Sequence, residues 1–183
     1  LFLPAALTVS MMAAGGQVFA KEVAAQAVLD NYANIALAKY EDSLSTAEAL
    51  QGSIEKLLAN PTDATLKAAR DAWVEARIPY QQSEVYRFGN AIVDDWEGKV
   101  NAWPLDEGLI DYVSSDYQYE LGNEGASANI VANKTFQIGQ TTVDATNITP
   151  KLIAELNEIG GSEANVASGY HAIEFLLWGQ DRK

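Results

Sequence analysis

Apolar residues recur at helical spacing over much of this chain, and few segments alternate in the manner of strands. Residues 21–59 predict one long helix, or two helices joined near residues 43–45. A second helix is predicted over residues 64–88, with Thr62 as its N-cap and with a kink at Pro79, which lacks an N–H. These two segments favour a helical bundle.

The middle of the chain has a different character. Residues 89–126 are rich in Gly, Asn, Asp, Trp and Pro, which predicts a long, irregular, aromatic-rich loop. Residues 128–142 are interpreted as a short helix. Thr149 followed by Pro150 then starts another helix, which the glycine pair at 160–161 ends. Since strand signals are weak, the predicted fold is all-α.

The last helix is predicted over residues 163–178, with Ser162 as its N-cap and Gly179 at its end. It is apolar nearly all round, so it should be buried. His171 is the only histidine of the chain, and it lies three residues before Glu174 on the same face. A buried carboxylate is costly, so Glu174 should be paired, protonated or bound to a cation.

Two interpretations of this pair remain open. A histidine and a carboxylate separated by three residues provide the spacing from which helical bundles build metal sites. A core histidine that hydrogen-bonds to a nearby glutamate has the same spacing, and the pattern His-x-x-Glu is short enough to occur by chance.

A second set of polar residues follows Trp73 on the core-facing side of the predicted second helix. Arg77 and Glu84 continue this stripe and would need counter-charges if they were buried. Ion pairs on the helix surface, such as Glu84 with Arg87, are the alternative. After Trp103 and Pro104, a turn could present the carboxylate of Asp106 or Glu107 to the bundle, although a solvated loop acid is commoner.

Composition limits the possible partners. The net charge of −13 repels phosphate backbones, which argues against nucleic acid and favours cations. Without cysteine, the chain has no disulfide, no thiolate zinc site and no cysteine nucleophile. Residues 1–20 are apolar, lack charge and end in Val18-Phe19-Ala20, which predicts an export signal cleaved after Ala20. The remaining domain spans residues 21–183.

Three strings resemble one known family. Gly169, His171 and Glu174 match the Gly-x-His-x-x-Glu signature of the imelysin family, also called peptidase family M75, which includes iron-regulated and insulin-cleaving bacterial proteins. Residues 73–90 and 101–113 are also similar to that family. The resemblance implies an all-helical, bundle-like, exported protein of the bacterial periplasm or outer surface, often linked to iron uptake. Relatives continue well past the signature, so we expect the chain to represent the N-terminal half of a longer protein.

Three functions remain under consideration. In the first, the protein binds a metal ion in iron acquisition, with membrane components of iron uptake as possible partners. One imidazole with several carboxylates suits iron better than zinc, although zinc is possible. The expected ligands are His171, Glu174 and, as a third candidate, Glu84, with Arg77, Asp106 and Gly169 around them.

The second function is a metallopeptidase, which would need about three protein ligands, an open position for water and a general base. The chain lacks His-Glu-x-x-His, and its single histidine leaves carboxylates as the other ligands. The third is an architectural role, in which the polar cluster fixes how the helices meet.

Overall fold

The computed structural model describes residues 24–119 and 121–180. The predicted export signal at residues 1–20 lies outside them. The described part is mostly helical, with one two-stranded sheet, so the all-α class is confirmed. None of its helices combines the length and the apolar character needed to cross a membrane.

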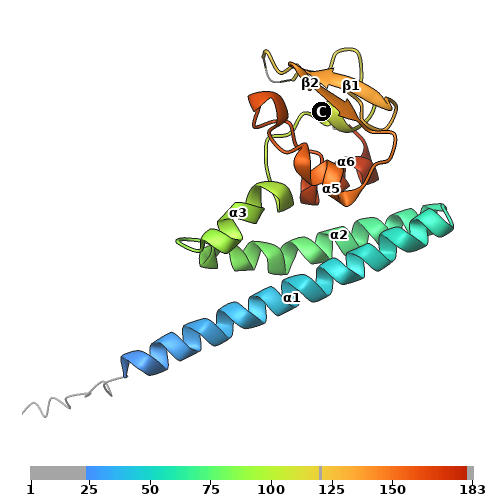
Figure 1. Cartoon of the computed structure of the whole chain (residues 1–183). Helices are drawn as coiled ribbons and strands as arrows, with labels where there is room; N and C mark the ends of the chain where they lie inside the picture. Colours follow the sequence, from blue (N-terminus) through green and yellow to red (C-terminus); the bar gives the residue numbers. More distant parts are fainter. Residues whose placement is uncertain (1–23, 120, 181–183) are drawn as a thin grey trace, which may run out of the picture.

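Two long helices form an antiparallel hairpin along one side of the molecule (Figure 1). Helix α1 (Ala25–Ala59) is continuous, so the single-helix alternative is confirmed. Helix α2 (Asp63–Ser83) starts with the predicted Thr62 cap. The Thr62 hydroxyl accepts a hydrogen bond from the Thr65 N–H (3.2 Å), and the Thr65 hydroxyl accepts one from the Thr62 N–H (3.0 Å), which satisfies two backbone donors.

The region after α2 differs from the prediction. Helix α2 ends at Ser83 and not near residue 88, and the 3₁₀ turn η1 (Glu84–Tyr86) follows. Helix α3 (Ala91–Val100) then occupies part of the predicted irregular loop, which was wrong for these residues. Arg87 forms ion pairs with Asp94 (3.2 Å) and Glu97 (2.9 Å) of α3. The spacing of apolar residues in the sequence does not reveal these contacts.

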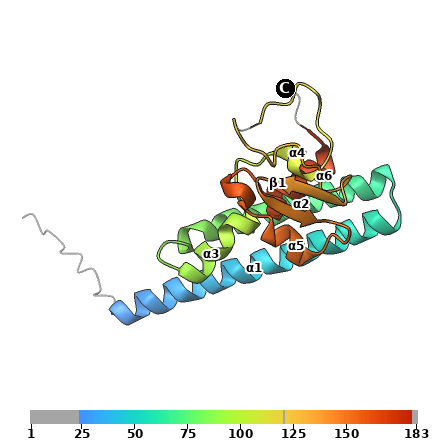
Figure 2. The ribbon, with the colours of Figure 1, turned by 45° about the horizontal axis from the view of Figure 1, so that its top comes forward.

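A second layer lies above α2 in Figure 1 and contains the shorter elements (Figures 1 and 2). They are α4 (Glu107–Ile110), β1 (Thr135–Ile138), β2 (Thr141–Asp144), α5 (Pro150–Glu155) and the 3₁₀ turn η2 (Ile159–Gly161). Thr149 caps α5 as predicted, because its hydroxyl accepts a hydrogen bond from the Leu152 N–H.

The helix predicted over residues 128–142 was wrong, because β1 and β2 form an antiparallel hairpin there. Ile138 and Val143 are buried while their strand neighbours are mostly exposed, as in a half-buried strand. Gly139 has φ +59° in the two-residue loop, a backbone conformation that suits a tight hairpin and that glycine adopts readily.

The last helix, α6 (Gly169–Trp178), is shorter than predicted. Ser162 does not cap it, because residues 162–168 form a non-helical segment whose members 164–167 are buried in the second layer. Gly179 ends the helix with φ +80°, as predicted. The burial predicted for α6 is only partial, since Leu176 is 56% exposed.

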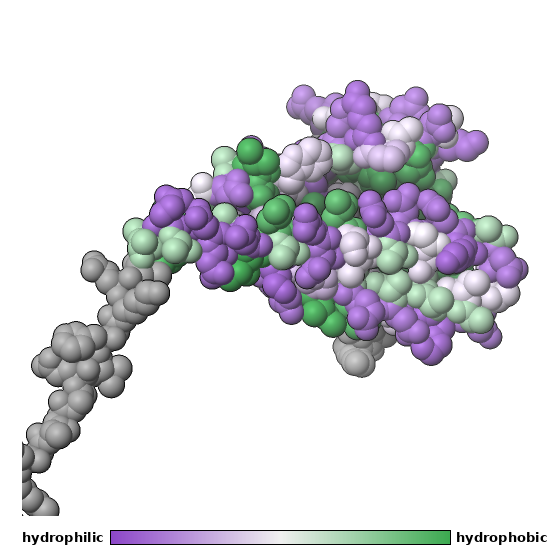
Figure 3. All heavy atoms as spheres, turned by 90° about the horizontal axis from the view of Figure 1, so that it is seen from below, coloured by the Kyte–Doolittle hydropathy of each residue, from purple (hydrophilic) through white to green (hydrophobic). Residues whose placement is uncertain are grey.

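The main core lies between α4, the β hairpin, α5 and α6, around Leu109, Ile138, Leu156, Val166 and Phe175. A smaller core joins Leu50 of α1, Ala76 of α2 and Tyr170 of α6. The outer surface of the α1–α2 hairpin retains large exposed apolar side chains, among them Leu37, Leu44, Leu58, Val74 and Ile78. Figure 3 shows apolar groups between polar ones on the face seen from below.

Candidate functional site

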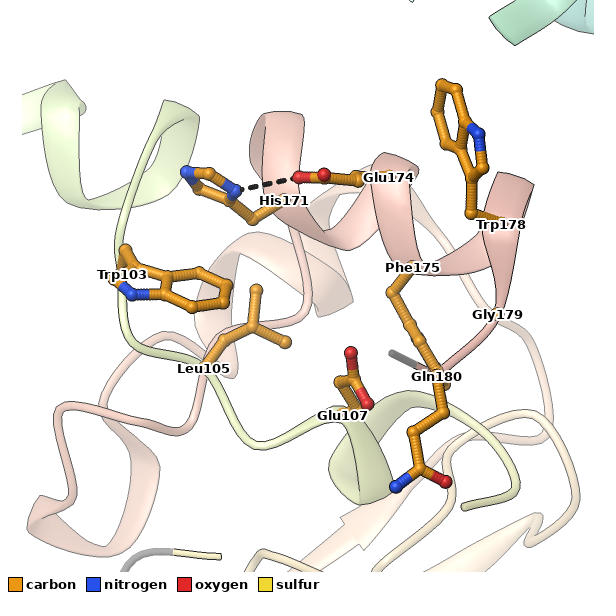
Figure 4. Close-up of a pocket in the computed structure, with 9 residues that line it drawn as sticks. All are labelled: Trp103, Leu105, Glu107, His171, Glu174, Phe175, Trp178, Gly179 and Gln180. Atoms are coloured by element: carbon orange, nitrogen blue, oxygen red, sulfur yellow. Dashed lines mark hydrogen bonds and ion pairs between the residues drawn. The ribbon is translucent and has the colours of Figure 1, made fainter. Parts of the chain in front are cut away.

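His171 and Glu174 form a hydrogen-bonded pair on one face of α6, with His171 Nδ1 3.0 Å from Glu174 Oε2 (Figure 4). The His171 side chain is 18% exposed and that of Glu174 is 44% exposed, so the pair lies at the protein surface rather than deep in the core. An ionised carboxylate only accepts hydrogen bonds, so Nδ1 donates. In the neutral imidazole, this leaves the lone pair on Nε2.

The pair forms one wall of a cavity of about 460 Å³ between α6 and the segment leading into α4. The other lining residues are Trp103, Leu105, Glu107, Phe175, Trp178, Gly179 and Gln180 (Figure 4). The indole of Trp103 lies against the imidazole, with ring centroids 4.9 Å apart and planes inclined by 53°. The cavity therefore combines one imidazole, two carboxylates and an aromatic wall.

Gly169 determines how closely α6 approaches α3. Its φ is +84°, and a Cβ at this position would overlap the Val100 carbonyl, lying 2.6 Å from the carbonyl carbon and 2.9 Å from the Lys99 oxygen. The preceding Ser168 hydroxyl donates a hydrogen bond to that Lys99 carbonyl (2.8 Å). The glycine expected near the site thus acts through backbone packing at the start of α6, two residues before His171.

Two side chains of α2 donate hydrogen bonds to backbone carbonyls of α6, and neither was predicted for this role. Arg70 donates from Nε (2.9 Å) and Nη2 (2.6 Å) to the Leu177 carbonyl, in the last turn of α6 where carbonyls lack helical partners. Trp73 Nε1 donates to the Tyr170 carbonyl (2.8 Å). In the sequence, only the stripe of core-facing residues around Trp73 indicated that this face of α2 packs against another helix.

Asp106 and Glu107 are adjacent in sequence and have separate environments. Asp106 is 3% exposed and does not line the cavity; its carboxylate accepts hydrogen bonds from Asn123 Nδ2 (2.5 Å) and the Tyr117 hydroxyl (3.4 Å). Asn123 Nδ2 also donates to Asn165 (2.8 Å), which is fully buried. Asp106 thus belongs to this buried polar network and is not among the residues that line the cavity with His171. Glu107 is the acid that lines the cavity.

Arg77 and Glu84 lie away from the cavity lining. The Arg77 guanidinium lies 5.0 to 5.8 Å from the ring centroids of Trp73, Tyr80 and Tyr170 and donates to Asn101 Oδ1. Glu84 is exposed, and its carboxylate accepts a long hydrogen bond from Asn101 Nδ2 (3.5 Å).

The structure does not bring Glu84 together with His171 and Glu174, because Glu84 does not line their cavity. Helix α2 ends at Ser83, and Glu84 is the first residue of η1. Within residues 24–119 and 121–180, no three His, Asp or Glu side chains lie close enough together to hold one metal ion.

The aromatic contacts around Arg77 predict a pH dependence. Burial, followed by the nearby Glu97 and Glu84 carboxylates, raises the pKa of Tyr80 to about 12. Because the folded state favours the neutral phenol, this contribution to stability is complete below pH about 10, the usual pKa of tyrosine, and is lost as pH rises towards 12. We expect the free energy of unfolding, measured in urea, to fall over this pH range. It should fall less steeply for Tyr80→Phe. Equal slopes would contradict the assignment.

Comparison with known proteins places these features in a family. A family model described as imelysin, peptidase M75, matches residues 36–183. Iron-regulated protein A of Synechococcus elongatus is 32% identical over 81 residues, which are 44% of this chain and 20% of that protein. The aligned part is therefore a small share of the relative's length. Since the family model covers α2 to α6 and most of α1, the chain belongs to the imelysin family.

Proposed function

We propose that this imelysin-family protein binds iron outside the bacterial cytoplasm, as part of iron acquisition, and that His171 is a ligand. The observation that carries the proposal is the His171–Glu174 pair on the wall of the 460 Å³ cavity. A carboxylate that accepts from one ring nitrogen of a histidine holds the ring in place and raises the basicity of the other nitrogen, as in many metal sites. The name of the matched relative, Iron-regulated protein A, supports a link to iron.

The donor set fits an open site better than a closed one. His171 supplies nitrogen, while Glu174 supplies oxygen as a ligand or as the partner that orients the imidazole, and Glu107 adds a carboxylate to the same cavity. Nitrogen and hard oxygen donors suit iron, with zinc as a second candidate. Because the described residues bring no three such side chains together, the remaining donors would come from water, from the cargo or from residues outside the described part.

Metal retention tests this proposal. We expect purified wild-type protein, loaded anaerobically with Fe²⁺ and desalted, to retain iron, and His171→Ala to lose it at least tenfold more readily, since one of few protein donors is gone. Glu174→Gln should weaken retention less, because an amide oxygen can still accept from Nδ1. Elemental analysis gives the ratio of iron to protein. Glu84→Gln is the matched control, because Glu84 lies outside the cavity lining and should leave retention unchanged.

The alternatives give different results in the same variants. Equal iron content in wild type and His171→Ala would refute the ligand assignment. If His171→Ala instead lowered the melting temperature without changing iron content, the pair would be architectural. The peptidase alternative comes from the name of the family model. It requires that wild type cleave a peptide library and that His171→Ala and removal of metal each abolish cleavage.

A further inference from the structure

The cavity beside His171 is larger than a single hydrated ion needs. A water molecule occupies about 30 Å³ in the liquid, so about fifteen would fill the 460 Å³, whereas an octahedral ion binds about six donors. Protein side chains alone do not complete a site there, because no three suitable acids or histidines meet in the part of the chain that the structure describes. The space is therefore suited to an ion together with a second, organic ligand.

The walls of the cavity indicate the chemistry of that second ligand. Leu105, Phe175 and Trp178 line the cavity with Trp103, a residue that is 69% exposed and whose indole already lies beside the His171 ring. A flat ring placed against this indole would gain stacking and apolar burial. An aliphatic ligand of the same size and charge would gain less.

Charge indicates that the second ligand is an anion. A ferric ion carries three positive charges, and the cavity offers the two carboxylates of Glu107 and Glu174 with one imidazole that is neutral when it binds metal. One positive charge would remain at the site. A chelator with anionic oxygen donors would offset this positive charge and occupy the coordination positions that the protein leaves open.

We infer that this cavity binds ferric iron as a ternary complex with a bidentate aryl anion, such as a hydroxyaryl carboxylate, whose ring packs on Trp103. The inference rests on the proposed function and specifies the form of its cargo. His171 binds the metal, and Trp103 selects the organic ligand. Neither the family model nor the name of the relative assigns a role to Trp103.

Salicylate and malonate are the probes: both chelate Fe³⁺ as dianions through six-membered rings, salicylate after its phenol releases a proton to solvent, and only salicylate has an aromatic ring. Protein loaded with Fe²⁺ and oxidised in air is titrated with each anion by calorimetry, and the iron that remains bound is measured after desalting. A phenolate is intrinsically the stronger donor for Fe³⁺, so the stacking contribution is measured on salicylate alone, as the three- to tenfold loss of affinity that we expect in Trp103→Ala. The iron should stay on the protein, and metal-free protein should bind neither anion.

Trp103→Ala should leave the malonate affinity unchanged, because malonate has no ring to pack on the indole. Trp96→Ala is the control, since Trp96 is also exposed (59%) but does not line this cavity. Circular dichroism shows whether both variants fold. If Trp103→Ala does not fold, Trp178→Ala, which alters another aromatic wall of the cavity, gives a second test.

Several outcomes would overturn the inference: a salicylate affinity that Trp103→Ala leaves unchanged, salicylate binding to metal-free protein, or removal of iron by salicylate. These results leave the proposed function intact. Iron content that does not depend on His171 refutes the proposed function itself, and with it the ternary complex. Iron retained only when salicylate is supplied supports the ternary complex and excludes binding of the bare ion.

Discussion

Replacing Gly169 by alanine is expected to destabilise the protein by about 2–5 kcal/mol. About 1–2 kcal/mol comes from forcing an L-residue to adopt the left-handed conformation that Gly169 has at φ +84°. A further loss of about 1–3 kcal/mol comes from overlap of the new Cβ with the Val100 carbonyl. The overlapping atoms belong to the backbone at the end of α3, so they cannot move aside as a flexible side chain would.

Gly161→Ala separates these two contributions. Gly161 has φ +82°, close to that of Gly169, but a Cβ there would meet nothing within 4 Å. Urea unfolding should therefore show a loss of only about 1–2 kcal/mol for this variant. Equal losses for the two variants would mean that close packing of α6 on α3 is not the reason for glycine at position 169.

Gly169→Ala should also reduce iron retention. Any shift of the first turn of α6 away from α3 moves His171 relative to Trp103, which lies in the segment that follows α3. Gly169 thus links the stability of the fold to the geometry of the candidate site.

The parts of the fold that could be predicted are those determined by local chemistry. The caps Thr62 and Thr149 and the helix end at Gly179 need only a hydroxyl or a glycine within a few residues of the helix terminus, and the structure confirms all three. The long helix α1 follows from its sustained periodicity. Such signals act over one helical turn, so a single sequence contains them.

The parts that could not be predicted depend on contacts between distant residues. Residues 164–167 follow a plausible Ser162 cap, yet they are not helical, and Asn165 hydrogen-bonds there to the Ile159 carbonyl and to Asn123. The β hairpin is stabilised by burying Ile138 and Val143 against the second layer. Neither arrangement leaves a periodic pattern longer than four residues.

The candidate site, too, could be predicted only where it depends on local spacing. The proximity of His171 and Glu174 follows from their spacing on one helix, and the structure confirms that they contact each other. Whether Glu84 reaches them depends on where α2 ends, and the angular stripe assumed that the α-helix continues past Ser83. The choice between Asp106 and Glu107 depends on which carboxylate meets Asn123, a residue at the far end of the loop.

The adjacent acids Asp106 and Glu107 provide the second large effect, because one belongs to the core and the other to the cavity. Asp106→Ala should destabilise the protein by about 2–4 kcal/mol. It removes the acceptor of a hydrogen bond from the buried Asn123 amide, and a buried donor without a partner costs about 1–3 kcal/mol in addition to the lost packing. Asp106→Asn should cost less, since its amide oxygen can still accept from Asn123.

Glu107→Ala is the matched control, and we expect a loss of about 1 kcal/mol or less, because this side chain is only partly buried. Iron retention should show the opposite order, with Glu107→Ala weakened and Asp106→Asn close to wild type. Chemical denaturation and elemental analysis of the same preparations measure both quantities. If Asp106→Asn lost iron while remaining as stable as wild type, Asp106 would act at the site after all. The order of the two effects therefore tests whether neighbouring carboxylates divide stability and binding between them.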